Sequence, residues 1–290
     1  MSKKRKKIRK VWPFWMAIFA LATIGMGVSV YYTIAGGEQS DYIVQTNAFF
    51  APFEFYEGRE IVGVDVEIVD RVAEKLNKTI RLENVEFDVI IDNVEAGRIA
   101  DAGAAGLTIT QARAEKVDFT IPYYNSVQYV IYDKNNPPRM RDGHVVWQEL
   151  AGTILGSQTG STGYLFADAE IEEGSLKDTG TTVKGLESHQ LSADAILSHI
   201  IDYAIIDELA ANFIVDKNPG LAAAPLYVKG AKIEDDYPVE ESYAIAVNKN
   251  RPELLAAFNE VLTEMTWKNE DGESELDRLI IKYMGLSEEE

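Results

Sequence analysis

Two charged residues in this sequence are placed where each could bind one end of a small zwitterion. Arg113 follows Thr110, which can cap a helix, so the arginine lies in a first helical turn, where a cation is unfavourable unless an anion lies beside it. A guanidinium binds a carboxylate through two hydrogen bonds. Asp207 directly follows an apolar predicted strand, and ligands of open α/β sheets gather at such strand ends. The alternatives are a surface arginine and a helix-capping acid.

A glycine-rich segment, Gln158-Thr-Gly-Ser-Thr-Gly163, joins a predicted strand to a predicted helix. Glycines free backbone N–H groups to converge on an anion at a helix start. The segment lacks the Gly-Lys-Ser/Thr ending of a phosphate-binding loop, which argues against nucleotide binding. We therefore expect either a carboxylate-binding loop or an ordinary turn between a strand and a helix.

The composition excludes several classes of protein. Cysteine is absent, so the chain has no disulfide, thiolate metal site or cysteine nucleophile. A formal net charge of −19 at pH 7 argues against a nucleic-acid partner. No metal-ligand cluster, serine triad or paired carboxylate stands out, and His144, His189 and His199 lie outside the segments above. We predict no metal, no cofactor and no enzymatic activity.

The elements that position these residues follow an alternating pattern. From Asp41 onward, short β-branched runs alternate with amphipathic helical patterns, which indicates an α/β fold with mainly parallel sheets. Asp65 and Ser274 are placed to cap helices, a helix is predicted after Ser161, and Asn77 is a reasonable stop for the helix after Asp65. Strands are predicted at 42–45, 80–85, 128–132, 153–155, 203–206 and 243–247.

The amino terminus carries an export signal. Seven basic residues and no acid lie within the first ten, and an uncharged stretch follows from Val11 to Ala35. Because basic residues stay in the cytoplasm, this order sends everything after residue 35 across the membrane. About twenty apolar residues suffice to span a bilayer, so residues 1–37 are predicted to form a basic head and a membrane anchor. Cleavage near Ala35 is the alternative.

Several short motifs, in their order and spacing, resemble the polar amino-acid-binding family of solute-binding proteins, bacterial family 3. The motifs are Pro52-Phe-Glu-Phe55, Gly63-Val-Asp65, Thr108-Ile-Thr-x-x-Arg113, Val117-Asp-Phe119, Pro122-Tyr-Tyr124, Gly160-Ser-Thr162 and Ala204-Ile-Ile-Asp207. The resemblance covers nearly all of residues 41–286. It implies a type II periplasmic-binding-protein fold, in which two α/β lobes joined by two crossing strands hold the ligand between them. Lobe one would comprise residues 38–127 plus 238–290, and lobe two residues 128–237.

The resemblance also implies a function. The protein would be a monomeric, extracytoplasmic amino-acid-binding component of an ABC uptake transporter, on the periplasmic or extracellular face of the cytoplasmic membrane. Its partners would be a free amino acid, an ABC permease and an ATPase, besides the membrane through the N-terminal segment. A ligand sensor without a permease is one alternative. An enzyme similar to cyclohexadienyl dehydratases, which share such lobes, is another.

Site roles follow from the same resemblance. Arg113 would bind the ligand α-carboxylate, helped by Thr108 and the backbone N–H near Gly106, and Asp207 would bind the α-ammonium. Three consecutive residues would close on the carboxylate from lobe two: Ser161, Thr162 and Gly163. Phe50 and Phe87 would sandwich the ligand side chain, or else be plain core aromatics. Asn47 stands where some glutamine-selective relatives have an acid, which leaves the ligand side chain open.

Overall fold

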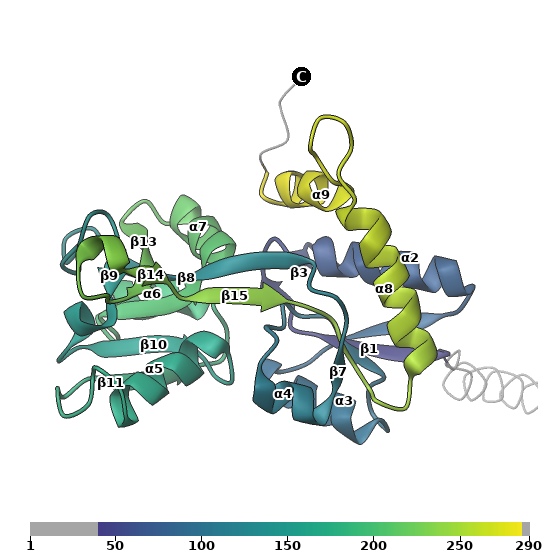
Figure 1. Cartoon of the computed structure of the whole chain (residues 1–290), viewed down its shortest axis with the longest axis horizontal. Coiled ribbons are helices and arrows are strands. Elements are labelled where there is room, and N and C mark those ends of the chain that lie inside the picture. The colour runs from purple at the N-terminus through teal and green to yellow at the C-terminus, as the bar shows by residue number, and fades with distance from the viewer. Residues whose placement is uncertain (1–39, 286–290) are drawn as a thin grey trace, which may run out of the picture. The chain divides into compact units, whose positions relative to one another are not determined.

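The computed structural model describes residues 40–285 (Figure 1). Within that range, none of the helices combines the length and the apolar character that a membrane crossing requires. The predicted basic head and signal or anchor segment, residues 1–37, lies outside the described residues, so its fate stays a prediction.

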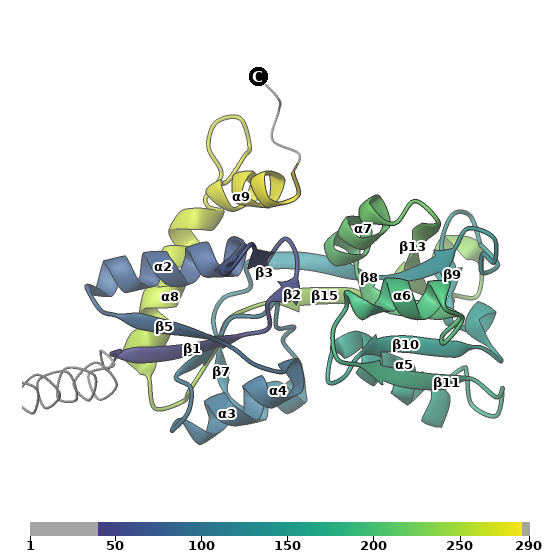
Figure 2. The ribbon, with the colours of Figure 1, turned by 180° about the vertical axis from the view of Figure 1, so that it is seen from behind.

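The first sheet has five strands in the order β5-β1-β6-β16-β7. Its strands are β1 (Tyr42–Thr46), β5 (Ile80–Asn84), β6 (Ala102–Gly103), β7 (Asp118–Phe119) and β16 (Ala246–Val247). Strands β5 and β6 run parallel to β1, whereas β16 is antiparallel to both of its neighbours. The helices of this part are α2 (Val64–Leu76), α3 (Ile90–Ala96), α4 (Gln111–Lys116), α8 (Pro252–Thr266) and α9 (Glu275–Tyr283). Helix α2 lies on one face of the sheet, and α3 and α4 lie on the other (Figures 1 and 2).

The second sheet has the strand order β11-β10-β12-β8-β13-β14, with β15 paired to β8 and β9 paired to β13. Its strands are β8 (Tyr124–Asp133), β9 (Val145–Val146), β10 (Ile154–Gln158), β11 (Thr182–Leu186), β12 (Tyr203–Asp207), β13 (Leu221–Val228), β14 (Tyr237–Pro238) and β15 (Glu240–Tyr243). Its helices are α5 (Thr162–Glu172), α6 (Leu191–Leu197) and α7 (Glu208–Lys217). A small third sheet consists of β2 (Phe49–Phe50), β3 (Glu54–Glu57) and β4 (Glu60–Val62). Three short 3-10 helices complete the list: Phe87–Val89, Trp147–Leu150 and Ile233–Asp235.

Two antiparallel strands, β8 and β15, connect the first and second sheets (Figure 1). Strand β15 pairs with the start of β8, from Glu240 opposite Val127 to Tyr243 opposite Tyr124, and the chain then enters β16 of the first sheet. The α/β class is therefore confirmed. The sheets are mixed rather than mainly parallel, because β8 runs antiparallel to both β12 and β13. The lobe boundaries at 127/128 and 237/238 stay a prediction.

Helix α2 shows where local sequence signals succeed and fail. Asn77 ends the helix in the left-handed conformation, as predicted. Asp65 was expected to cap it, but the N-cap is Gly63, whose φ of 133° and 2.2 Å gap between a hypothetical Cβ and the Phe53 carbonyl oxygen admit only glycine. Asp65 lies one residue inside the helix and is buried. Its carboxylate makes no capping hydrogen bond and can therefore accept hydrogen bonds from another segment of the chain.

Candidate functional site

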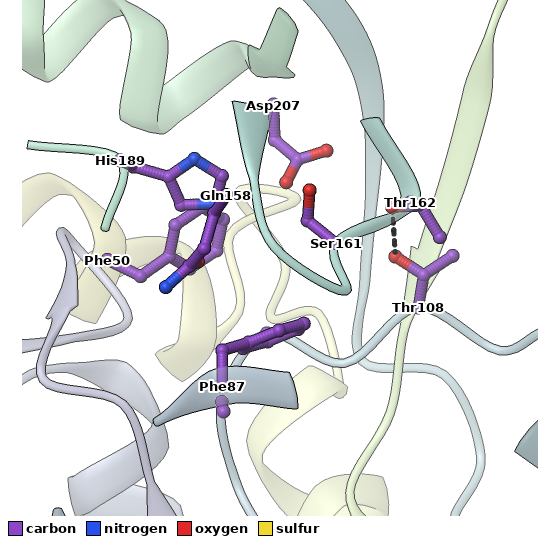
Figure 3. Close-up of a pocket in the computed structure, with 10 residues that line it drawn as sticks. Phe50, Phe87, Thr108, Gln158, Ser161, Thr162, His189 and Asp207 are labelled. Atoms are coloured by element: carbon purple, nitrogen blue, oxygen red, sulfur yellow. Dashed lines mark hydrogen bonds between the residues drawn. The ribbon is translucent and has the colours of Figure 1, made fainter. Parts of the chain in front are cut away.

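A small cavity lies where the segments after β6, β10 and β12 meet (Figure 3). It is lined by Phe50, Phe87, Ala105, Gly106, Thr108, Gln158, Ser161, Thr162, His189 and Asp207. These include most of the site residues predicted from sequence; Arg113, Gly163 and Asn47 lie beside the cavity instead. The space available to the centre of a water molecule is about 10 Å³, so the cavity holds about one water as it stands. A free amino acid requires the walls to move apart.

Arg113 contacts both parts of the chain, the part that contains the first sheet and the part that contains the second sheet. Helix α4 begins at the predicted cap, because the Arg113 N–H donates to Thr110 Oγ1 over 3.2 Å. The guanidinium donates to the carbonyl oxygens of Thr108, at 2.8 Å, and Gly160, at 3.0 Å, and its Cζ lies 5.6 Å from the Phe87 ring centre. Burial lowers the pKa of Arg113 from its usual value. The side chain is 8% exposed, which decides against the surface-arginine alternative.

Asp207 ends β12 and occupies the N-cap position of α7, yet its side chain makes no capping hydrogen bond. The carboxylate instead faces the cavity and accepts a hydrogen bond from Gln128 Nε2. Burial, and then the negative charge of Glu241, raise the pKa of Asp207 well above its usual value. The carboxyl group is thus oriented toward the site and not toward the helix it precedes, which favours ligand binding over the capping alternative.

Glu241 is a second buried carboxylate that the sequence did not reveal. It lies on β15 and accepts hydrogen bonds from Thr108 Oγ1, from Thr162 Oγ1 at 2.9 Å and from Gln128 Nε2 at 3.0 Å. Gln128 also donates to Asp207, so the two acids share one amide. No paired carboxylate stands out in the sequence, because this pair forms only where β12 and β15 both pair with β8 and bring together residues more than thirty positions apart.

The glycine-rich loop is a turn between a strand and a helix, and it also lines the cavity. A helix follows Ser161 as predicted, and Ser161 caps this helix, α5, by accepting from the Tyr164 N–H at 3.2 Å. Thr162 Oγ1 lies 3.4 Å from Thr108 Oγ1 (Figure 3). Gly163 does not line the cavity. A Cβ there would lie 2.9 Å from Ser157 Oγ, so glycine is needed for helix α5 to approach the sheet.

The predicted carboxylate-binding N–H of Gly106 has another partner. It donates to Asp65 Oδ2 at 3.0 Å, and Asp65 Oδ1 accepts from the Tyr123 hydroxyl at 2.6 Å. Burial raises the pKa of Asp65 to about 6. Gly106 has a φ of 53°, and a Cβ at this position would lie 2.5 Å from the Phe50 ring. The loop is therefore set by Asp65 and packed against Phe50, and this N–H does not face an empty site.

Asn47 connects the part with the first sheet to the part with the second sheet through hydrogen bonds. Its Nδ2 donates to the Val85 carbonyl oxygen at 2.7 Å, and its Oδ1 accepts from Gln158 Nε2 at 2.8 Å. The Gln158 amide also donates to the Glu187 carbonyl oxygen at 3.2 Å. Asn47 therefore positions a cavity residue, Gln158, and does not itself line the cavity.

Residues 40–285 contain no cluster of His, Cys, Asp and Glu suited to a metal ion. His144 does not line the cavity, and its Nε2 lies 2.8 Å from Asp236 Oδ2. His189, by contrast, lines the cavity.

The model of "Bacterial extracellular solute-binding proteins, family 3" matches residues 42–285. The chain belongs to this family. Its members are solute-binding proteins rather than enzymes, and the resemblance drawn from the short motifs is confirmed.

Several proteins named as amino-acid-binding proteins are similar to this chain in sequence or in structure. The chain is 27% identical over 274 residues to the arginine-binding extracellular protein ArtP of Bacillus subtilis (strain 168), covering 93% of this chain and 97% of that one. It is 26% identical over 222 residues to a probable histidine-binding protein of Campylobacter jejuni, covering 76% and 78%. Among solved structures, the substrate-binding protein AbpA of an amino acid ABC transporter from Streptococcus pneumoniae, bound to L-arginine, has a TM-score of 0.71. Its identity to this chain is 27%, with 86% of this chain and 96% of that chain covered.

For this member of family 3, sequence reasoning missed four site residues: Gln128, Gln158, His189 and Glu241. Gln158 opens the glycine-rich segment and could have been chosen from its position at a strand end. Gln128 and Glu241 lie inside crossing strands, where an isolated polar residue predicts a solvent-facing side chain. Their burial depends on pairing between distant segments.

Proposed function

We propose that this protein is the extracytoplasmic amino-acid-binding component of an ABC uptake transporter. It acts as a monomer whose lobes, residues 38–127 plus 238–290 and residues 128–237, close around a free amino acid. The family and the named relatives support this function. The partners are an ABC permease and its ATPase, and the similar protein AbpA is named as the substrate-binding protein of an amino acid ABC transporter.

The observation that carries the proposal is the meeting of opposite charges from separate segments. Arg113 comes from α4 beside the first sheet, and Asp207 comes from β12 of the second sheet. The Arg113 guanidinium donates to the carbonyl oxygen of Thr108, which lines the same cavity as Asp207. The guanidinium binds the α-carboxylate and the carboxylate binds the α-ammonium, each through charge-assisted hydrogen bonds.

Closure is already supported by direct contacts between the two parts. Arg113 donates to the Gly160 carbonyl oxygen, Thr108 and Thr162 lie within hydrogen-bond distance, and Gln158 donates to Asn47. A neutral hydrogen bond contributes about 0.5–1.5 kcal/mol and one to a charged group about 1.5–3 kcal/mol. Because the cavity as it stands is too small for an amino acid, the ligand enters while the two lobes are further apart. Its charged contacts then favour a closed state whose cavity is wider than the present one.

A thermal-shift screen of the purified full-length protein against the common amino acids tests this function. At a concentration of about 100 times Kd, a ligand stabilises the folded state by about 2.7 kcal/mol, which raises Tm measurably. We expect at least one amino acid to do so, and Arg113→Ala and Asp207→Asn to abolish the effect. Arg139→Ala and Asp216→Asn, at exposed positions, are the matched controls and should respond like wild type. A site variant that responds like its control would refute the site assignment.

A further inference from the structure

Glu241 binds the two threonine hydroxyls that are predicted to bind the ligand carboxylate. Its Oε2 accepts from the hydroxyl of Thr108, in the part with the first sheet, and at 2.9 Å from that of Thr162, which opens α5 in the part with the second sheet. The two hydroxyl oxygens lie 3.4 Å apart on one side of the cavity (Figure 3). One carboxylate oxygen therefore connects the two parts of the chain.

Each threonine hydroxyl has a single O–H to donate. While Thr108 and Thr162 donate to Glu241, neither of them can donate to the carboxylate of an amino acid in the cavity. Glu241 forms with them the same charge-assisted hydrogen bonds that a ligand carboxylate would form. The carboxylate of the chain and the carboxylate of the ligand are therefore alternatives for the same two donors.

The position of Glu241 on β15 makes it part of the connection between the two sheets. Glu241 lies opposite Ser126 of β8, and Gln128 of β8 donates to Glu241 Oε1 at 3.0 Å. Strand pairing and this amide hold the acid in place. Because Thr108 and Thr162 belong to different parts of the chain, at least one of them must leave Glu241 when the parts separate. Separation therefore breaks a charge-assisted hydrogen bond.

Burial limits how strongly these contacts hold the two parts together. Glu241 is 2% exposed. Burial raises its pKa, whereas the hydrogen bonds that it accepts and the charge of Arg113 lower it. The loss of hydration of a buried carboxylate offsets much of what its hydrogen bonds contribute. We therefore expect this arrangement to exchange with one in which the two parts lie further apart.

We propose that Glu241 is a latch between the two parts of the chain and an internal competitor of the ligand carboxylate. In the latched form, Glu241 binds both threonine hydroxyls and the cavity holds about one water. In the open form at least one hydroxyl is released, and a ligand carboxylate then binds it. Ligand binding therefore includes the loss of latch contacts, which lowers the affinity. The competition rests on the proposed function, whereas the latch does not.

Isothermal titration of the full-length protein with a matched pair of ligands tests the competition. The pair is the amino acid that raises Tm most in the thermal-shift screen and its α-carboxamide, at a pH where both ammonium groups are protonated. Their side chains and ammonium groups are the same, so only the carboxylate distinguishes them. We expect Glu241→Gln to raise the preference for the acid over the amide about tenfold, because a like charge is removed. Glu240→Gln, at the exposed preceding residue, should leave the preference unchanged. An equal or smaller preference in Glu241→Gln would overturn the competition.

A distance measurement tests the latch without any ligand. Spin labels on Glu95→Cys and Thr182→Cys, at exposed positions of α3 and β11, report the separation of the two parts by pulsed electron paramagnetic resonance. The otherwise unsubstituted protein should show a short and a long component. Glu241→Gln should lower the ratio of short to long at least about tenfold, and Thr162→Val, which removes one donor, should lower it as well.

Glu240→Gln is again the control and should leave the ratio unchanged. The latch would be overturned if the short component is missing without ligand, or if Glu241→Gln and Glu240→Gln give the same distribution. A wild type that binds none of the common amino acids would overturn the proposed function and the competition with it, while the distance distributions would still decide the latch.

Discussion

Asp207 and Glu241 place two carboxylates beside one guanidinium, that of Arg113. The acids share the amide of Gln128; burial raises both of their pKa values, and the charge of Glu241 further raises that of Asp207. A bound zwitterion brings one charge of each sign to these three side chains. Its ammonium stabilises the complex more than it would in a site with a single acid, because it offsets the repulsion between two carboxylates.

The coupling between these acids is measurable. Glu241→Gln removes the second-largest cause of the raised pKa of Asp207 while keeping a similar shape. We expect the pKa of Asp207, followed by carbon-13 NMR of its carboxyl group, to be lower in the variant than in wild type. Glu240→Gln, at the exposed preceding residue, is the control and should leave it unchanged. Equal Asp207 titrations in wild type and Glu241→Gln would show that the two acids do not interact.

Asp65 gives a prediction about pH and stability. Its pKa is raised from 3.8 to about 6 in the folded protein, so the folded state holds a proton that the unfolded state releases. The stabilisation is fully present below pH 3.8 and is lost as pH rises toward 6. That loss is about 3 kcal/mol at 1.36 kcal/mol per pKa unit. In urea unfolding, Asp65→Asn should show a smaller decline in the free energy of unfolding between pH 4 and pH 6, and an identical decline would contradict the assignment.

At the scale of elements, local signals predicted the helix ends that are set by local chemistry. Thr110 and Ser274 each accept the capping hydrogen bond expected of them, and Ser161 caps the helix predicted to follow it. Asp65 failed as a cap because its carboxylate is held by the Gly106 N–H, forty-one residues later. The residues in and around helix α2 give no indication of that contact. Capping rules succeed where the partner is three residues away and fail where a distant segment competes for the same side chain.

The start of α2 depends on a glycine for steric reasons. Gly63 has a φ of 133°, and a Cβ would lie 2.2 Å from the Phe53 carbonyl oxygen. Gly63→Ala should therefore lower the free energy of unfolding by more than about 2 kcal/mol in urea denaturation. Gly58→Ala is a matched control, since Gly58 has a φ of 65° but no atom within 4 Å of its hypothetical Cβ. It should lose only about 1–2 kcal/mol, the cost of the left-handed conformation. Equal losses would show that the contact with Phe53 is relieved by movement.

At the scale of the whole molecule, the order of weak motifs predicted more than any one of them. The alternation of β-branched runs with helical patterns predicted the α/β class, and the order and spacing of short motifs predicted the family. The match over residues 42–285 confirms the family. The composition of the cavity was predicted only in part. Asp207 follows a strand and Ser161 caps a helix, where local rules apply, whereas Glu241 and His189 become site residues only through the packing of distant segments.

The absence of cysteine makes the central claim, closure around an amino acid, directly measurable. Spin labels on Glu95→Cys and Thr182→Cys, at exposed positions of α3 and β11, report the distance between the two parts by pulsed electron paramagnetic resonance. We predict that a bound amino acid shortens and narrows the distance distribution, and that Arg113→Ala removes the response. A distribution that is the same with and without every amino acid that binds would contradict the account.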